Sequence, residues 1–112
     1  MDNSEVINSI NEFSSLVYNK YSCVDIILFG SYAKGTFHKE SDIDIAVILE
    51  DFDNSTNIQL ELMRIRRKID SRIEPHPFRL ADFNTTNPLV NEIVKYGKRI
   101  ENSDIANNEV IN

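Results

Sequence analysis

Two short apolar runs, joined by a loop that contains glycine, limit what this chain can fold into. Residues 23–30 and 42–49 are rich in Ile, Val and Leu, a composition typical of strands buried in a sheet. Both runs are far shorter than the ~20 apolar residues that a membrane helix needs. With helical segments before and after them, they predict a small α/β domain.

The segments around these runs carry apolar residues at helical spacing. Residues 4–20 predict a first helix, and a second helix begins at Thr56 or Asn57, with an apolar stripe that runs to Ile69. The expected element order is α-β-β-α-β-α, with one small mixed sheet packed against the helices. The last helix has its own start and stop signals: Asn87 as cap, Pro88 at the first position and Gly97 as terminator.

Residues 71–78 predict a third strand, which lies at an edge of the sheet. Pro75 and Pro77 are two residues apart, so their missing N–H groups leave one side of the backbone unable to pair. The same period of two puts Glu74 and His76 on one face of the strand and the prolines on the other.

Length, charge and cysteine usage predict a single cytoplasmic domain. The 112 residues suit one domain, which we expect to span residues 1–100, followed by an acidic, Asn-rich and mobile tail at 101–112. A net charge of −6 argues against direct binding of a nucleic-acid polymer, whose phosphates call for a basic surface. Cys23 has no cysteine to pair with, and the polar N-terminus does not resemble a signal peptide, so no membrane association is expected.

Asp42 and Asp44 are the first candidate site residues. Residues i and i+2 of a strand point to the same face, about 6–7 Å apart at their Cα atoms, whereas Ile43, Ile45 and Val47 face the core. Two carboxylates this close repel each other, and partial burial increases the repulsion. A divalent cation such as Mg²⁺ removes the conflict and keeps ligand positions free for water and phosphate.

The turn at Gly30-Ser31 is the second candidate site. A glycine lets a phosphate approach the backbone closely, and free N–H groups, the Ser31 hydroxyl and Lys34 would hold its oxygens. A phosphate site beside a metal-binding carboxylate pair predicts a nucleoside triphosphate with Mg²⁺, and hence phosphoryl or nucleotidyl transfer.

Gly30-Ser31, then ten residues, then Asp42-Ile43-Asp44 resembles the signature of the DNA polymerase β superfamily, and the compact length resembles its minimal nucleotidyltransferase (MNT) branch. The likeness covers about residues 4–100. It implies a polymerase β palm-like fold, a two-metal Mg²⁺ site and transfer of a nucleoside monophosphate. It also implies an antitoxin that transfers AMP from ATP to a tyrosine of a HEPN-type toxin. The donor could also be another nucleoside triphosphate. The implied site comprises Asp42, Asp44 and Glu74 as catalytic metal ligands, and Gly30, Ser31, Lys34 and Ser41 around the nucleotide.

Several alternatives stay open at the level of sequence. Asp70 rivals Glu74 as the third carboxylate, and His76 could support the site from the same face as Glu74. The basic run at residues 64–68 is either a solvated helix face or a contact for phosphate or an acidic partner. For the whole protein, the alternatives are an antitoxin that acts by contact alone, and a transferase for a small-molecule acceptor.

Overall fold

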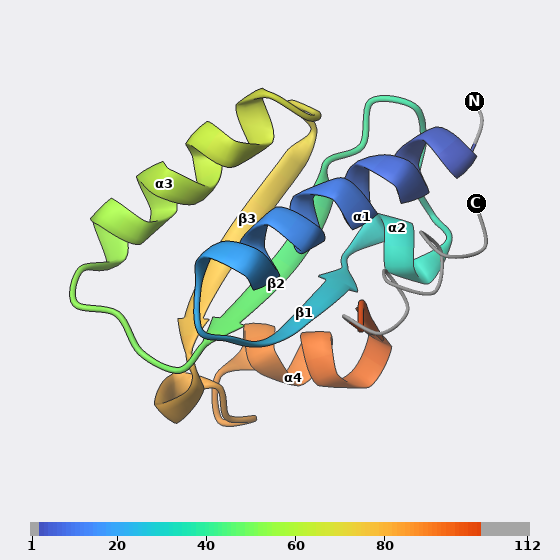
Figure 1. Ribbon diagram of the computed structural model, residues 1–112. Helices are drawn as coiled ribbons and strands as arrows, with labels where there is room; N and C mark the ends of the chain where they lie inside the picture. The colour runs from blue at the N-terminus through green and yellow to red at the C-terminus, as the bar shows by residue number, and fades with distance from the viewer. Residues whose placement is uncertain (1–2, 102–112) are drawn as a thin grey trace.

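The computed structural model describes residues 3–101 and contains a four-stranded mixed sheet (Figure 1). The strand order is β3-β2-β1-β4. Strand β1 (Cys23–Phe29) runs antiparallel to β2 (Ile43–Leu49) and β4 (Lys98–Arg99), whereas β3 (Ile73–Arg79) runs parallel to β2. The α/β class and the mixed sheet are therefore confirmed. The predicted tail lies outside the described residues, except for Glu101.

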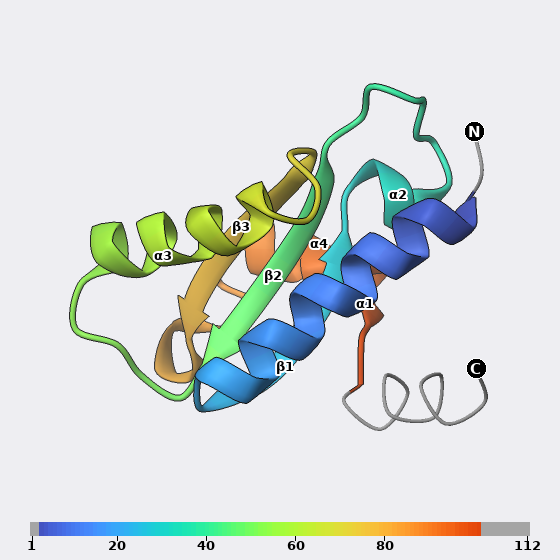
Figure 2. The same ribbon diagram turned by 45° about the horizontal axis from the view of Figure 1, so that its top comes forward.

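Helices cover both faces of the sheet. Figure 2 shows α1 and α3 in front of the strands and α4 behind them. None of the helices within residues 3–101 has the length and hydropathy of a membrane span. The helices are α1 (Asn3–Lys20), α2 (Ser31–Lys34), α3 (Ser55–Arg67), a 3₁₀ turn (Leu80–Asp82) and α4 (Pro88–Tyr96).

Local capping sets the ends of the two later helices. The Asn54 side chain accepts a hydrogen bond from the backbone N–H of Asn57 at 3.0 Å, so α3 begins slightly earlier than predicted. The predicted limits of α4 are confirmed: Asn87 caps its start and Gly97 donates its N–H to the carbonyl of Ile93 at 2.8 Å.

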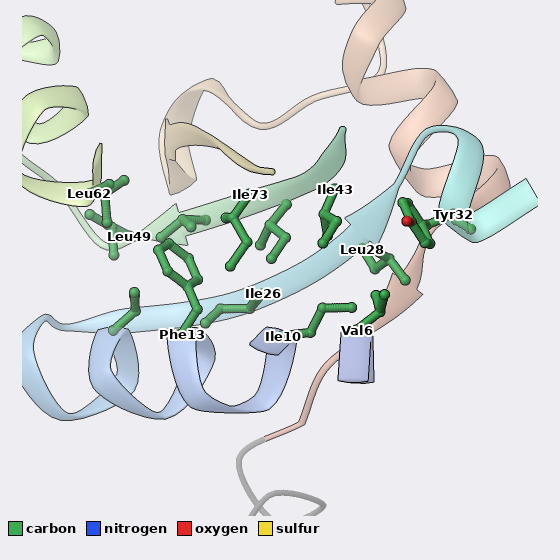
Figure 3. Close-up of a cluster of buried hydrophobic side chains, with 14 of the residues drawn as sticks. Val6, Ile10, Phe13, Ile26, Leu28, Tyr32, Ile43, Leu49, Leu62 and Ile73 are labelled. Carbon is green, nitrogen blue, oxygen red and sulfur yellow. The ribbon is translucent and has the colours of Figure 1, made fainter. Parts of the chain in front are cut away.

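One face of the sheet forms the larger core with α1 and α3 (Figure 3). Phe13 and Val17 of α1 and Leu62 of α3 are completely buried there. The prediction that alternate residues of β2 face this core is confirmed, since Ile43, Ile45 and Val47 all belong to it.

The opposite face carries a second, smaller core, which the sequence did not reveal. Ala46 and Ile48 of β2 pack there with Phe29 of β1 and Ile93 of α4. Strand β2 is thus buried on both faces along most of its length. Asp44 lies on this second face, where the apolar pattern of the strand is interrupted.

The third strand lies at the edge of the sheet, as its prolines predicted. Ile73 and Pro75 are buried, whereas Glu74 and His76 are partly exposed, in keeping with the predicted alternation. On the α3 side, the Gln59 amide donates to the carbonyl of Pro75 at 3.0 Å. The side chains of Glu74 and His76 therefore lie on the face of the sheet that also holds Asp44.

Candidate active site

The topology of the sheet brings the sequence motifs to one end of the domain (Figure 1). Strand β1 ends at Phe29, next to the start of β2, because the two strands are antiparallel. Strand β3 starts at the same end, because it runs parallel to β2. Asp44 is paired with Phe29 on one side and with Glu74 on the other. The Gly30-Ser31 turn and the candidate carboxylates thus come from three adjacent strands.

Gly30 and Asp44 are packed directly against each other. Gly30 has φ 74° and ψ −152°, a conformation open almost only to glycine. A Cβ atom built on residue 30 would overlap Oδ2 of Asp44. Glycine is therefore required here for its backbone and for its lack of a side chain, which lets the Asp44 carboxylate pack against the turn.

The other oxygen of Asp44 contacts His76 of β3. Oδ1 lies 3.1 Å from Nε2 of the imidazole, and both side chains are about three-quarters buried. Asp42, by contrast, precedes the first residue of β2 and is exposed. The prediction of two aspartates within the strand is correct for Asp44 and wrong for Asp42, because pairing with β3 begins only at Ile43.

The donor types at this end of the sheet suit a hard cation, since carboxylate oxygens are the ligands that Mg²⁺ prefers. Within residues 3–101, however, no three acidic, His or Cys side chains are positioned to hold one ion together. Asp44 and Glu74 are neighbours in register, but the three carboxylates are not gathered around one point.

Two further candidates have partners within the protein. The Lys34 ammonium forms a 3.2 Å ion pair with Glu92 of α4 and lies 5.1 Å from the ring centre of Tyr96. The Ser41 hydroxyl accepts a hydrogen bond from the backbone N–H of His38 at 2.9 Å. The ion pair is partly exposed, and such pairs contribute little to stability, so Lys34 can change partner at small cost.

Asp70 is engaged by Arg72 rather than directed to the site. Its two oxygens accept from Nε of Arg72 at 3.0 Å and from a terminal nitrogen at 2.8 Å. This guanidinium lowers the pKa of the Asp70 carboxyl, and burial opposes the effect only in part. The carboxylate also accepts the backbone N–H of Arg72, which ties down the turn before β3.

The basic run at residues 64–68 lies on α3, which covers the opposite face of the sheet from Asp44. Arg66 donates to the carbonyls of Ser71 and Ile73, so this residue has a structural contact. Arg64, Arg67 and Lys68 are exposed. Their position separates them from the candidate site.

Sequence reasoning missed the contribution of α4. Glu92 and Tyr96 hold Lys34, although 58 residues separate Glu92 from Lys34 in the chain. Their spacing of four places them on one side of a helix, but this spacing carries no sign of what they contact. The face shared by His76 and Glu74 was predictable from the strand period, whereas the contact with Asp44 was not.

A glycine turn at the end of a strand packs against a carboxylate here, with a second acid in the next strand; carboxylate oxygens are donors that suit a hard cation. Comparison with known proteins identifies the family. Residues 11–106 match the family described as "Polymerase beta, Nucleotidyltransferase", and the chain belongs to it.

Three relatives place the chain within this family. It is 37% identical over 77 residues to the "Protein adenylyltransferase MntA" of Shewanella oneidensis, a match that covers 67% of this chain and 51% of the relative. The chain thus spans about half the length of that protein. A crystal structure described as "the toxin-antitoxin with AMP-PNP" has 30% identity and a TM-score of 0.62, over 88% of this chain and 78% of the other.

The third relative comes from a structure of a "tri-AMPylated Shewanella oneidensis HEPN toxin in complex with MNT antitoxin". It has 27% identity and a TM-score of 0.56, covering 85% of this chain and 70% of the other. The likeness confirms the resemblance to minimal nucleotidyltransferases that the Gly-Ser and Asp-x-Asp motifs indicated.

Proposed function

We propose that this protein is an Mg²⁺-dependent adenylyltransferase of the antitoxin type, which transfers AMP from ATP to a tyrosine hydroxyl of a HEPN-domain toxin. The observation that carries the proposal is the packing of the Gly30 turn against the Asp44 carboxylate, with Glu74 beside Asp44 in register. The similarity to a protein adenylyltransferase and to toxin-antitoxin complexes supports this choice of donor and acceptor.

In this proposal the acceptor oxygen forms a bond to the α-phosphorus of ATP. The bond from that phosphorus to the bridging oxygen breaks, and pyrophosphate leaves. The proton of the hydroxyl passes to a nearby base, for which Glu74 is the candidate. Asp42, Asp44 and Glu74 are not gathered around one point in the structure, so they would have to come together when Mg²⁺ binds; the ion would then neutralise charge on the phosphates.

The nucleotide is placed by the turn and by the residues around it. Gly30 allows close approach of the phosphates. The Ser31 hydroxyl and the Lys34 ammonium, which can give up its ion pair with Glu92 at small cost, would bind the phosphate oxygens. The Ser41 hydroxyl uses an oxygen lone pair for His38, so its hydrogen can still be donated to a phosphate. The protein partner would supply the acceptor geometry, on which much of the rate of such reactions depends.

Incubation with ATP, Mg²⁺ and the cognate HEPN toxin tests the proposal. We expect intact-protein mass spectrometry to show the toxin gaining mass in steps of one AMP, with release of pyrophosphate. The double variant Asp42→Asn/Asp44→Asn is the control and should add nothing. If the toxin stays unmodified but wild type and control inhibit it equally, the protein acts by contact and the transferase proposal is wrong.

Variants of Glu74 and Asp70 should show that Glu74 acts in transfer and that Asp70 stabilises the fold. We expect Glu74→Gln to lose most of the transfer activity and to unfold as wild type does. Asp70→Asn should keep the activity but lose about 1–3 kcal/mol of unfolding free energy at neutral pH, the scale of a hydrogen bond to a charged group.

The pH dependence of unfolding checks the role of Asp70. Its pKa is lowered in the folded state by Arg72, so its stabilisation is complete above the unfolded pKa of about 3.9 and is lost as the pH falls through the lower folded value. Denaturant titrations at neutral and acidic pH should therefore show that Asp70→Asn loses less unfolding free energy on acidification than wild type does. Full stability of Asp70→Asn together with lost transfer would instead make Asp70 the third acid.

A further inference from the structure

His76 and Asp44 form a contact between neighbouring strands that the motif of the family does not include. Nε2 of His76 lies 3.1 Å from Oδ1 of Asp44, and 32 residues separate the two in the chain. A carboxylate oxygen only accepts hydrogen bonds, so Nε2 carries the hydrogen and donates it. The imidazole therefore holds one of the two oxygens of the candidate metal ligand.

The imidazole is itself held in place by the core. Its ring meets the ring of Phe29 edge to face, with centroids 4.9 Å apart and an interplanar angle of 61°. Phe29 is only 3% exposed and is paired with Asp44 across the two antiparallel strands. The three side chains thus come from β1, β2 and β3, which are rigid elements rather than loops.

The second oxygen of Asp44 faces the glycine turn. A Cβ atom on Gly30 would overlap Oδ2, which places this oxygen against the turn that would hold the triphosphate. With Oδ1 bonded to His76, rotation of the carboxylate is restricted. The oxygen that remains is the one that lies against the Gly30-Ser31 turn.

We infer that His76 is a positioning residue, which fixes the Asp44 carboxylate so that Oδ2 faces the Gly30-Ser31 turn and is ready to bind a divalent cation. The inference rests on the proposed function, because it takes Asp44 as a metal ligand. Groups that orient metal ligands in this way typically change metal affinity by about 10–100-fold. A merely structural His76 would instead affect folding and leave the affinity of the folded protein unchanged.

A matched pair of variants tests the inference. His76→Phe keeps an aromatic ring against Phe29 but removes the donor, whereas His76→Gln keeps an N–H donor at a similar reach. The probe is Mn²⁺ alone, added to the full chain, with free Mn²⁺ measured by electron paramagnetic resonance. We expect His76→Phe to weaken Mn²⁺ binding by about tenfold or more, and His76→Gln to bind nearly as wild type does, with similar thermal unfolding for all three proteins.

Asp44→Asn separates failure of this inference from failure of the proposed function. If Asp44→Asn loses Mn²⁺ binding but His76→Phe binds as wild type, His76 does not position the ligand and only the inference is overturned. Loss of thermal stability in both His76→Phe and His76→Gln, with the Mn²⁺ affinity of the folded proteins unchanged, also overturns it, in favour of a packing role. If wild type and Asp44→Asn bind Mn²⁺ alike, Asp44 is not a ligand and the proposed function fails as well.

Discussion

Asp44→Asn is expected to lower AMP transfer by about three orders of magnitude, because cation stabilisation of phosphate charge is worth several kcal/mol in the transition state. The fold should persist. Asparagine keeps a carbonyl oxygen that can accept the hydrogen bond from Nε2 of His76, and it fits beside Gly30 as aspartate does. Transfer of labelled AMP to the toxin and thermal unfolding of the variant are the two measurements.

Asp25→Asn is the matched control for this prediction. Asp25 is also a partly buried strand aspartate with a cationic partner, since Oδ2 lies 2.9 Å from Nε of Arg99. It lies on β1 away from the Gly30 turn, so its variant should keep full transfer activity. An Asp44→Asn protein as active as Asp25→Asn would contradict the proposed role of Asp44.

Gly30→Ala is expected to abolish binding of the triphosphate and to destabilise the fold. The added Cβ would overlap Oδ2 of Asp44, and the backbone conformation at φ 74° and ψ −152° is strained for alanine by about 1–3 kcal/mol. Asp44 must move away from the turn, so the site loses its geometry together with its stability. Calorimetric titration with a non-hydrolysable ATP analogue and Mg²⁺ measures binding, and denaturant titration measures the loss of stability.

Gly35→Ala provides the control for backbone strain. Gly35 also has a positive φ of 77°, but a Cβ atom there would meet no atom within 4 Å. This variant should lose about 1–2 kcal/mol, the cost of a left-handed residue, and keep nucleotide binding. The double variant Gly30→Ala/Asp44→Ala should recover part of the stability that Gly30→Ala loses. No recovery would mean that the overlap with Asp44 does not cause the loss.

Much of the fold could be predicted because its signals are local. Asn87, Pro88 and Gly97 act on their own helix, and the missing N–H groups of Pro75 and Pro77 keep β3 at an edge wherever the sheet forms. The strand β4 has only two residues, too few for a pattern, and it exists because β1 offers it an edge to pair with. The second core was missed for a related reason, since a strand buried on both faces has no alternation to read.

The candidate site, too, could be predicted from the sequence only in part. The Gly-Ser turn and the Asp-x-Asp spacing are visible in the sequence, and a family resemblance follows from them. The sequence favoured Glu74 over Asp70 as the third acid, but the contacts that distinguish the two were not visible, because they form only in the folded protein. Arg72 folds back onto Asp70 in the turn before β3, whereas Glu74 lies beside Asp44 in the sheet.

The sequence alone determined which residues share a strand face, where the last helix begins and ends, and which acids and glycines stand near one another along the chain. Only the tertiary structure decided that Asp44 lies between Gly30 and His76, and that Lys34 contacts α4. Periodicity fixes the side to which a residue points, because it follows from the geometry of one strand or helix. It does not fix the neighbour across the sheet, because pairing between distant segments depends on how the whole set of apolar faces is buried together.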